Sequence, residues 1–141
     1  MAALLLRQTR WARWDVFFIA LALAHGALLW AWPSITLIAL GLWWNANTIS
    51  HNFIHRPFFQ SRALNASFSL YLSLLLGFPQ SLWRSRHLSH HLWHHGARNP
   101  IESGLASLDF GAALALWGAL LVFAPHFTLT VYLPGYLCGL G

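Results

Sequence analysis

Long apolar segments separated by short polar ones run along most of the chain. The first apolar segment extends from Val16 to Trp32, and Pro33 ends it because proline has no N–H to donate to a helix. A second segment starts at Ser34, and we expect its helix to continue beyond the apolar residues to His51. The two segments predict a helical hairpin, with arms slightly shorter than the ~20 residues that usually cross a bilayer.

The second half of the chain contains one short and two longer apolar segments. After a polar stretch from Asn52 to Asn65, the run from Ala66 to Phe78 is too short to span a bilayer, so we expect an interfacial or re-entrant helix there. Gly77 and Pro79 end this helix. A second hydrophobic pair, broken at Pro125, then follows: Ala106 to Ala124 and Phe127 to Gly141.

Composition turns this pattern into a prediction of fold class. Of the 141 residues, 57% are hydrophobic and 8% are charged, whereas a soluble domain carries about 25% charged residues. We therefore predict an all-α integral membrane protein, a single domain over residues 1–141 with two transmembrane hairpins, cytoplasmic histidine-bearing helices and one short interfacial helix. The single cysteine, Cys138, excludes an internal disulfide framework and a thiolate metal site.

The arginines predict how the helices are oriented. They occur between Arg7 and Arg13 and between Arg56 and Arg98, and none lies near the turns at Pro33 and Pro125. The positive-inside rule therefore places the N-terminus and the histidine clusters on the cytoplasmic side. The net charge of +5 does not indicate a nucleic-acid partner, because no basic stripe lies on a soluble element. The first apolar segment is too long for a signal peptide and lacks a small-residue cleavage site, so we expect a retained helix.

Seven of the nine histidines fall in two clusters beside the apolar segments. His51 and His55 are four residues apart, which places both imidazoles on one face of a helix, with Asn47 one turn earlier as a group that could orient a ring nitrogen. The second cluster has histidines at relative positions 0, 3, 4, 7 and 8, which form one stripe on a helix: His87, His90, His91, His94 and His95.

A bound metal explains such a stripe better than unliganded rings. Neutral imidazoles packed together lack hydrogen-bond partners and protonated ones repel each other, whereas a metal accepts a lone pair from each neutral ring. Imidazole suits iron, zinc, copper and nickel, and acids are scarce, with only Asp15, Glu102 and Asp109 in the chain. An all-nitrogen site for iron or zinc is therefore predicted.

Other candidates have simpler interpretations. His25 is expected to pack inside the first span, and His126 to lie in the outer turn. The pattern leaves open whether His94 and His95 are ligands; if they are not, they either support the ligands or are simply polar residues at the interface. Four apolar residues could line a substrate slot, although each is expected to face lipid: Phe53, Phe58, Leu74 and Trp83.

The two clusters and the residues between them resemble the membrane fatty-acid desaturase and hydroxylase superfamily over about residues 45–100. The similarity rests on two histidine boxes with Pro79 and Trp83-Arg84 just ahead of the second, together with Phe58-Phe59, Ser61-Arg62, Asn65 and Gly77. The resemblance implies an integral-membrane enzyme with two irons. It also implies O2-dependent desaturation or hydroxylation of a lipid acyl or other long apolar chain, with electrons from a small donor protein of the cytochrome b5 or ferredoxin kind.

The resemblance also assigns the site residues. His51 and His55 match the first box of the superfamily, and His87, His90 and His91 match the second. The resemblance therefore makes all five histidines expected iron ligands. The superfamily has a third box after a further transmembrane pair, so we expect this chain to be the N-terminal portion, ending before that box.

Two alternatives remain beside the enzyme. One is a non-enzymatic membrane metal-binding protein for transport or sensing, and the other is an inactive fragment of the enzyme. Transport requires polar groups inside the spans, where only His25, Asn45 and Asn47 qualify, and the boxes at the membrane edge favour the enzyme.

Overall fold

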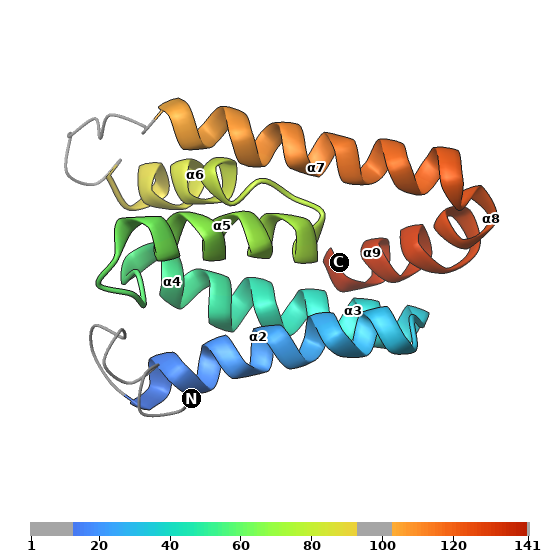
Figure 1. Ribbon diagram of the computed structural model, residues 1–141, viewed down its shortest axis with the longest axis horizontal. Helices are drawn as coiled ribbons and strands as arrows, with labels where there is room; N and C mark the ends of the chain where they lie inside the picture. The colour runs from blue at the N-terminus through green and yellow to red at the C-terminus, as the bar shows by residue number, and fades with distance from the viewer. Residues whose placement is uncertain (1–12, 93–102, 141) are drawn as a thin grey trace.

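The computed structural model describes the backbone of residues 13–92 and 103–140, and the side chains of residues 14–87 and 108–139. Every regular element in these ranges is helical, which confirms the all-α prediction (Figure 1). In chain order the elements are α2 (Arg13–Ala31), α3 (Ile35–Trp44), the π-helical η1 (Asn45–Ser50), α4 (His51–His55), α5 (Arg62–Leu76), α6 (Gln80–Leu92), α7 (Ser103–Phe123), α8 (Pro125–Phe127), the π-helical η2 (Thr128–Tyr132) and α9 (Leu133–Leu140).

The first two helices reverse direction at Pro33, as predicted, and run side by side (Figure 1). Ser34 begins α3, because its Oγ accepts a hydrogen bond from the backbone N–H of Leu37 at 3.2 Å. From Ile35 the chain stays helical to His55, so the predicted continuation to His51 is confirmed. The π-helical segment in the middle of this rod was not predicted.

Helix α5 begins at Arg62, four residues before the predicted apolar run. The reason is local, since Ser61 has extended backbone angles and its Oγ accepts from Leu64 N at 3.4 Å. The helix ends at Gly77, which has a φ of +61°. The carbonyl of Gly77 accepts a 2.9 Å hydrogen bond from Trp117 Nε1, so this turn also joins α5 to α7. Whether α5 lies at a membrane interface stays a prediction.

An aromatic cluster joins α2, α4 and α5. Phe58 is 2% exposed, and its ring centroid lies 5.9 Å from that of Phe18 and 5.3 Å from that of Phe53. Phe68 from α5 completes the group, 5.1 Å from Phe53. The expectation that Phe53 and Phe58 face lipid is therefore wrong. The loop after α4 folds back and places Phe58 between neighbouring helices, a contact that hydropathy does not encode.

The last helix packs mainly on α3, and Tyr136 keeps an aromatic contact with Trp117 of α7, with ring centroids 5.1 Å apart. The chain bends by 112° at Pro125 between the two apolar halves. A side chain added at Gly135 would meet Ile38, and one at Gly139 would meet Ala39, so these glycines allow α9 to approach α3 closely. The second predicted hairpin is thus an open one, with its two arms on different neighbours (Figure 1).

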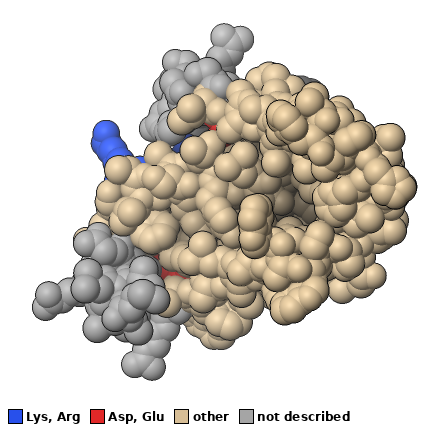
Figure 2. Space-filling model, turned by 45° about the vertical axis from the view of Figure 1, so that its right-hand side comes forward, with Lys and Arg blue, Asp and Glu red and all other residues tan. Residues whose placement is uncertain are grey.

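Membrane-crossing segments are fewer among the described helices than the hydropathy pattern predicted. One helix is long and apolar enough to cross a bilayer, from Trp14 to Ala31, and the bent pair Leu108–Phe123 and Pro125–Gly139 passes together. On the face in Figure 2, the charged side chains lie toward the left and the rest of the described surface is uncharged. The crossing of the membrane by two complete hairpins remains a prediction.

Asp109 holds the first turn of α6 against α7. Its carboxylate accepts hydrogen bonds from the backbone N–H of Ser81 at 2.8 Å and from the Ser81 hydroxyl at 2.7 Å, and it is 4% exposed. A buried carboxylate at a helix N-terminus is stabilised by unpaired N–H groups and by the helix dipole. This contact fixes the beginning of the helix that carries His87, His90 and His91.

Replacing Gly77 by alanine is expected to destabilise the fold. A non-glycine residue in the left-handed region costs about 1–2 kcal/mol, and the added Cβ would lie 2.8 Å from the Tyr132 hydroxyl. The control is Gly111→Ala, because an added Cβ there meets nothing within 4 Å and alanine is the better helix former by up to about 1 kcal/mol. Thermal unfolding in detergent, followed by circular dichroism, measures both. A Gly77→Ala protein as stable as the Gly111→Ala protein contradicts this interpretation.

The carboxylate of Asp109 is expected to couple energetically to Ser81. We expect Asp109→Asn to lower the free energy of unfolding by about 1–3 kcal/mol, because it removes the charge and leaves poorer acceptors for two donors. A double-mutant cycle with Ser81→Ala measures the interaction directly. Because Ser81→Ala keeps the backbone N–H, additive losses in the cycle would show that the hydroxyl–carboxylate bond contributes nothing to the contact.

Candidate metal centre

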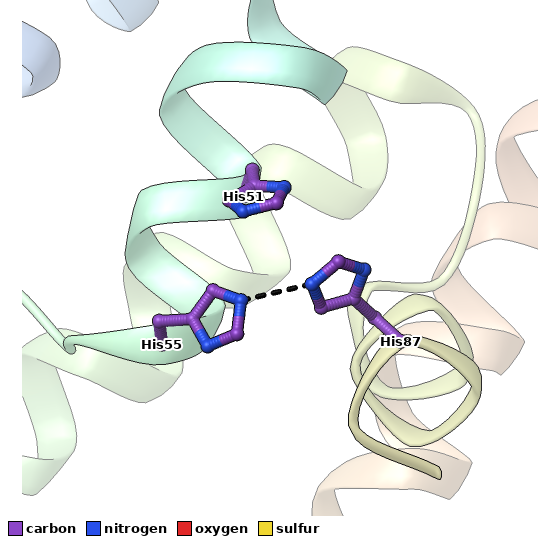
Figure 3. Close-up of side chains that lie close together, drawn as sticks. All are labelled: His51, His55 and His87. Carbon is purple, nitrogen blue, oxygen red and sulfur yellow. Dashed lines mark hydrogen bonds between the residues drawn. The ribbon is translucent and has the colours of Figure 1, made fainter. Parts of the chain in front are cut away.

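Three histidines from two separate helices meet at one end of the molecule. His51 and His55 lie one turn apart on α4, and His87 lies on α6 facing them (Figure 3). One ring nitrogen from each lies within 4.8 Å of the other two. The Nε2 atoms of His55 and His87 are hydrogen bonded at 2.8 Å, so one of these rings donates and the other accepts.

A buried polar contact brings the two helices together just before the histidines. Ser50, 0% exposed, donates its hydroxyl hydrogen to Oε1 of Gln80, which is 2% exposed. Ser50 precedes His51 directly, and Gln80 is the first residue of α6. The contact therefore fixes the position of α4 relative to α6 along their helix axes. A buried hydrogen-bonded pair of this kind is costly to break.

An aromatic ring supports His87 from its own helix. The Trp83 indole lies one turn before His87 and is nearly parallel to its imidazole, at 17° with centroids 6.5 Å apart. Phe78 packs edge-on against Trp83 at 6.3 Å. Trp83 is half-buried at the site, so it does not simply face lipid. The Nε2 of Gln80 and the Nε1 of Trp83 have no hydrogen-bond partner among the described residues.

Three asparagines satisfy backbone carbonyls along the rod that leads to the first cluster. In each case the side-chain amide donates to the carbonyl four residues earlier: Asn45 to Gly41 at 2.8 Å, Asn47 to Trp43 at 2.9 Å and Asn52 to Thr48 at 2.6 Å. The prediction that Asn47 orients a histidine ring is not borne out, because its amide group serves this local bond. A run of asparagines inside a helix is the signal for such bonds, and sequence reasoning missed it.

The remaining predicted ligands are placed only in part. His90 and His91 belong to α6, three and four residues beyond His87, while their side chains lie outside the described residues. His94, His95 and Glu102 lie outside the described residues altogether. The structure thus brings together three of the five histidines that the sequence singled out as ligands.

The two outlying histidines have the places expected of them. His25 is 8% exposed inside α2, where its Nδ1 accepts a hydrogen bond from Asn45 Nδ2 at 2.8 Å. His126 is exposed in the turn after Pro125. Both predictions, of a packed histidine and of a turn residue, are confirmed.

The donor set fits a transition metal. Metal–imidazole bonds of about 2.0–2.1 Å require ligand nitrogens roughly 3 Å apart, which the 2.8 Å separation of His55 and His87 already meets. A ring nitrogen of His51 lies within 4.8 Å of both. The metal-competent cluster in the described part of the chain consists only of imidazoles, since Asp109 is engaged at Ser81. Such a set suits iron or zinc, and binding requires neutral rings because protons compete for the same lone pairs.

Comparison with known proteins gives the family. Residues 27–141 match the sequence model described as fatty acid desaturase, a range that contains both histidine clusters. No curated protein and no solved structure matches the chain. Proteins of the matched family are membrane-associated oxidoreductases that use iron and act on acyl chains. Because the match covers most of its length, this chain belongs to the fatty acid desaturase family.

Proposed function

We propose that this protein takes part in the O2-dependent oxidation, by desaturation or hydroxylation, of a lipid acyl chain or another long apolar chain. The observation that supports the proposal most directly is the meeting of His51, His55 and His87. These residues come from both histidine clusters, and the chain belongs to a family of acyl-chain oxidoreductases. The predicted cytoplasmic placement of the site suits a small electron-donor protein as partner.

Each histidine has a defined role in the proposal. His51, His55 and His87 would each supply one ring nitrogen to iron, and His90 and His91 would add ligands from the next turn of α6. Two irons are expected in the complete enzyme. Bound iron would supply the activation of O2 that the removal of hydrogen from an unactivated C–H bond requires. Trp83 and the Ser50–Gln80 pair would hold the ligand helices in register.

The end of the molecule opposite the histidines exposes large apolar side chains. The histidines lie at the α4 end of the molecule, and the turns between α2 and α3 and at α8 lie at the opposite end (Figure 1). Large apolar side chains at those far turns are open to the surroundings, with Trp30 92% and Phe123 85% exposed. Exposure of this kind suits contact with lipid and not with water. This end of the molecule is therefore suited to lie in lipid, the environment in which an acyl chain is found.

Metal transport or sensing is the alternative, and the polar contacts disfavour transport. A path for ions through the spans would require polar groups that point into it. Asn45 and His25 instead bond to each other, and the Asn47 amide donates to a backbone carbonyl. These are the residues on which a transport path would depend.

Iron content of the purified chain tests the proposal. We expect the detergent-purified protein to bind iron, and His51→Ala, His55→Ala and His87→Ala to weaken binding at least about tenfold, because each removes a ligand nitrogen. His126→Ala is the matched control, since this histidine is exposed in the distant turn and should leave iron content unchanged. Metal analysis by mass spectrometry gives the stoichiometry.

A second measurement separates the enzyme from its alternative. Iron that is lost in the three variants, together with oxygen consumption and modified acyl chains in lipid assays with a reductant, is the result expected of the enzyme. Zinc in place of iron would contradict the oxidation of an acyl chain and favour the metal-binding alternative, whereas iron retained equally in His87→Ala and His126→Ala would exclude the proposed site.

A further inference from the structure

A π-helical segment lies between the apolar helix α3 and the first metal-ligand candidates. The segment η1 comprises Asn45–Ser50, and His51 follows it directly. π-Helical hydrogen bonds join residues five apart instead of four, so each turn contains more residues. The directions of all later side chains are therefore rotated relative to α3. Where His51 and His55 point consequently depends on whether η1 keeps this geometry.

One buried side chain ties the start of η1 to the neighbouring helix. Asn45 is 1% exposed, and its Nδ2 donates two hydrogen bonds, to Gly41 O at 2.8 Å and to His25 Nδ1 at 2.8 Å. Because Nδ1 of His25 accepts, the ring proton lies on Nε2, which faces the Leu37 carbonyl at 3.3 Å. The imidazole thus connects two points of the α3–η1 rod from α2.

Gly41 makes room for the His25 ring against the backbone of α3. A side chain added at Gly41 would overlap the His25 ring, so the absence of a side chain there lets the ring lie against the α3 backbone. Placing an imidazole and an amide between apolar helices is unfavourable even with these hydrogen bonds, because Oδ1 of Asn45 has no partner among the described residues. Apolar residues would pack the same helices without that cost, so the pair contributes more to the register of the two helices than to their attraction.

The far end of η1 is tied in the same manner. Ser50, its last residue, is buried and bonded to Gln80 of α6. The π segment is therefore attached to α2 at its first residue and to α6 at its last, and the histidine pair follows immediately. By contrast, Asn47 in the middle of η1 is exposed, and its amide donates to the Trp43 carbonyl of the preceding helix α3, with which η1 is continuous.

We propose that His25 and Asn45 are positioning residues, which fix η1 and thereby direct His51 and His55 toward His87. The inference rests on the proposed function for its metal, and on the hydrogen bonds of Asn45 for its geometry. The two residues lie outside the metal-ligand cluster and act on it through the helix.

The test replaces both partners by apolar residues of similar size, in the variant His25→Leu/Asn45→Leu. Removing both groups together avoids leaving one buried and unsatisfied, so the protein should fold. We expect Co²⁺ to bind about tenfold or more weakly than to the unmodified protein, with a changed visible absorption spectrum, as found when outer groups that orient ligands are removed. Asn47→Ala is the matched control and should bind within about twofold, with an unchanged spectrum.

Hydrogen–deuterium exchange in the absence of metal provides an independent measurement. Amide hydrogens of residues 43–56 should exchange faster in the double variant than in the unmodified protein or in Asn47→Ala, because η1 loses its attachment to α2. His25→Gln keeps one acceptor and one donor near the positions of the ring nitrogens, and we expect it to restore slow exchange and Co²⁺ binding. If the double variant does not fold, the exchange rates and Co²⁺ binding of His25→Gln still test whether the hydrogen bonds of residue 25 fix η1.

The outcomes separate the two proposals. Unmodified protein that binds no Co²⁺ contradicts the proposed metal site, while the exchange data still decide whether His25 and Asn45 fix residues 43–56. Normal Co²⁺ binding by the folded double variant overturns the positioning role, and so does weak binding with unchanged exchange. Loss of both properties in His25→Gln as well as in the double variant would show that the bulk of the ring, and not its hydrogen bonds, is required.

Discussion

The contact of the continuous η1–α4 helix with α6 carries the architecture of the site, because it joins residues that are thirty or more positions apart in the chain. Ser50 and Gln80 are both buried and bond to each other, and beyond them His55 and His87 come within 2.8 Å. Hydrophobic packing alone would hold two such helices together without fixing their relative height. A directional bond between two buried side chains fixes that height, and the imidazoles meet as a result.

Buried polar contacts also fix the positions of other helices in the bundle. Buried polar side chains in the described residues are few, and several occur where one helix must be held relative to another. Asp109 ties α7 to the beginning of α6, and Asn45 ties the α3–η1 rod to α2. Where close approach alone is required, small residues do this work, as Gly135 and Gly139 do between α9 and α3. The apolar remainder of the surface is left for lipid.

These constraints together explain how an apolar protein can present a polar metal site. An imidazole cluster is unfavourable beside lipid unless its lone pairs and protons are used, and a metal ion uses them at once. The His55–His87 hydrogen bond and the Trp83 ring order the cluster. Nitrogens already close to one another would lose little freedom on binding a metal, which would favour tight binding.

The sequence by itself determined the features that depend on neighbouring residues. Pro33 and Gly77 end helices because of their own backbone chemistry, and the spacing of His51 and His55 puts them on one helical face whatever surrounds them. The same neighbouring residues predicted three further features. The helix of His51 and His55 continues from α3, His25 is buried within an apolar segment, and His87 lies on a helix. The sequence also predicted which metals would suit the site, since residue type sets which ions a side chain can bind.

Only the tertiary structure decided which residues meet. Phe53 and Phe58 face a core instead of lipid because the loop after α4 folds back, and α9 packs on α3 because its glycines match that surface. Asn47 bonds to its own helix, while Asn45, two residues earlier, reaches another one. Hydropathy records how apolar a residue is, but a partner distant in sequence becomes visible only when the helices are assembled, because packing and hydrogen bonds join residues across the chain.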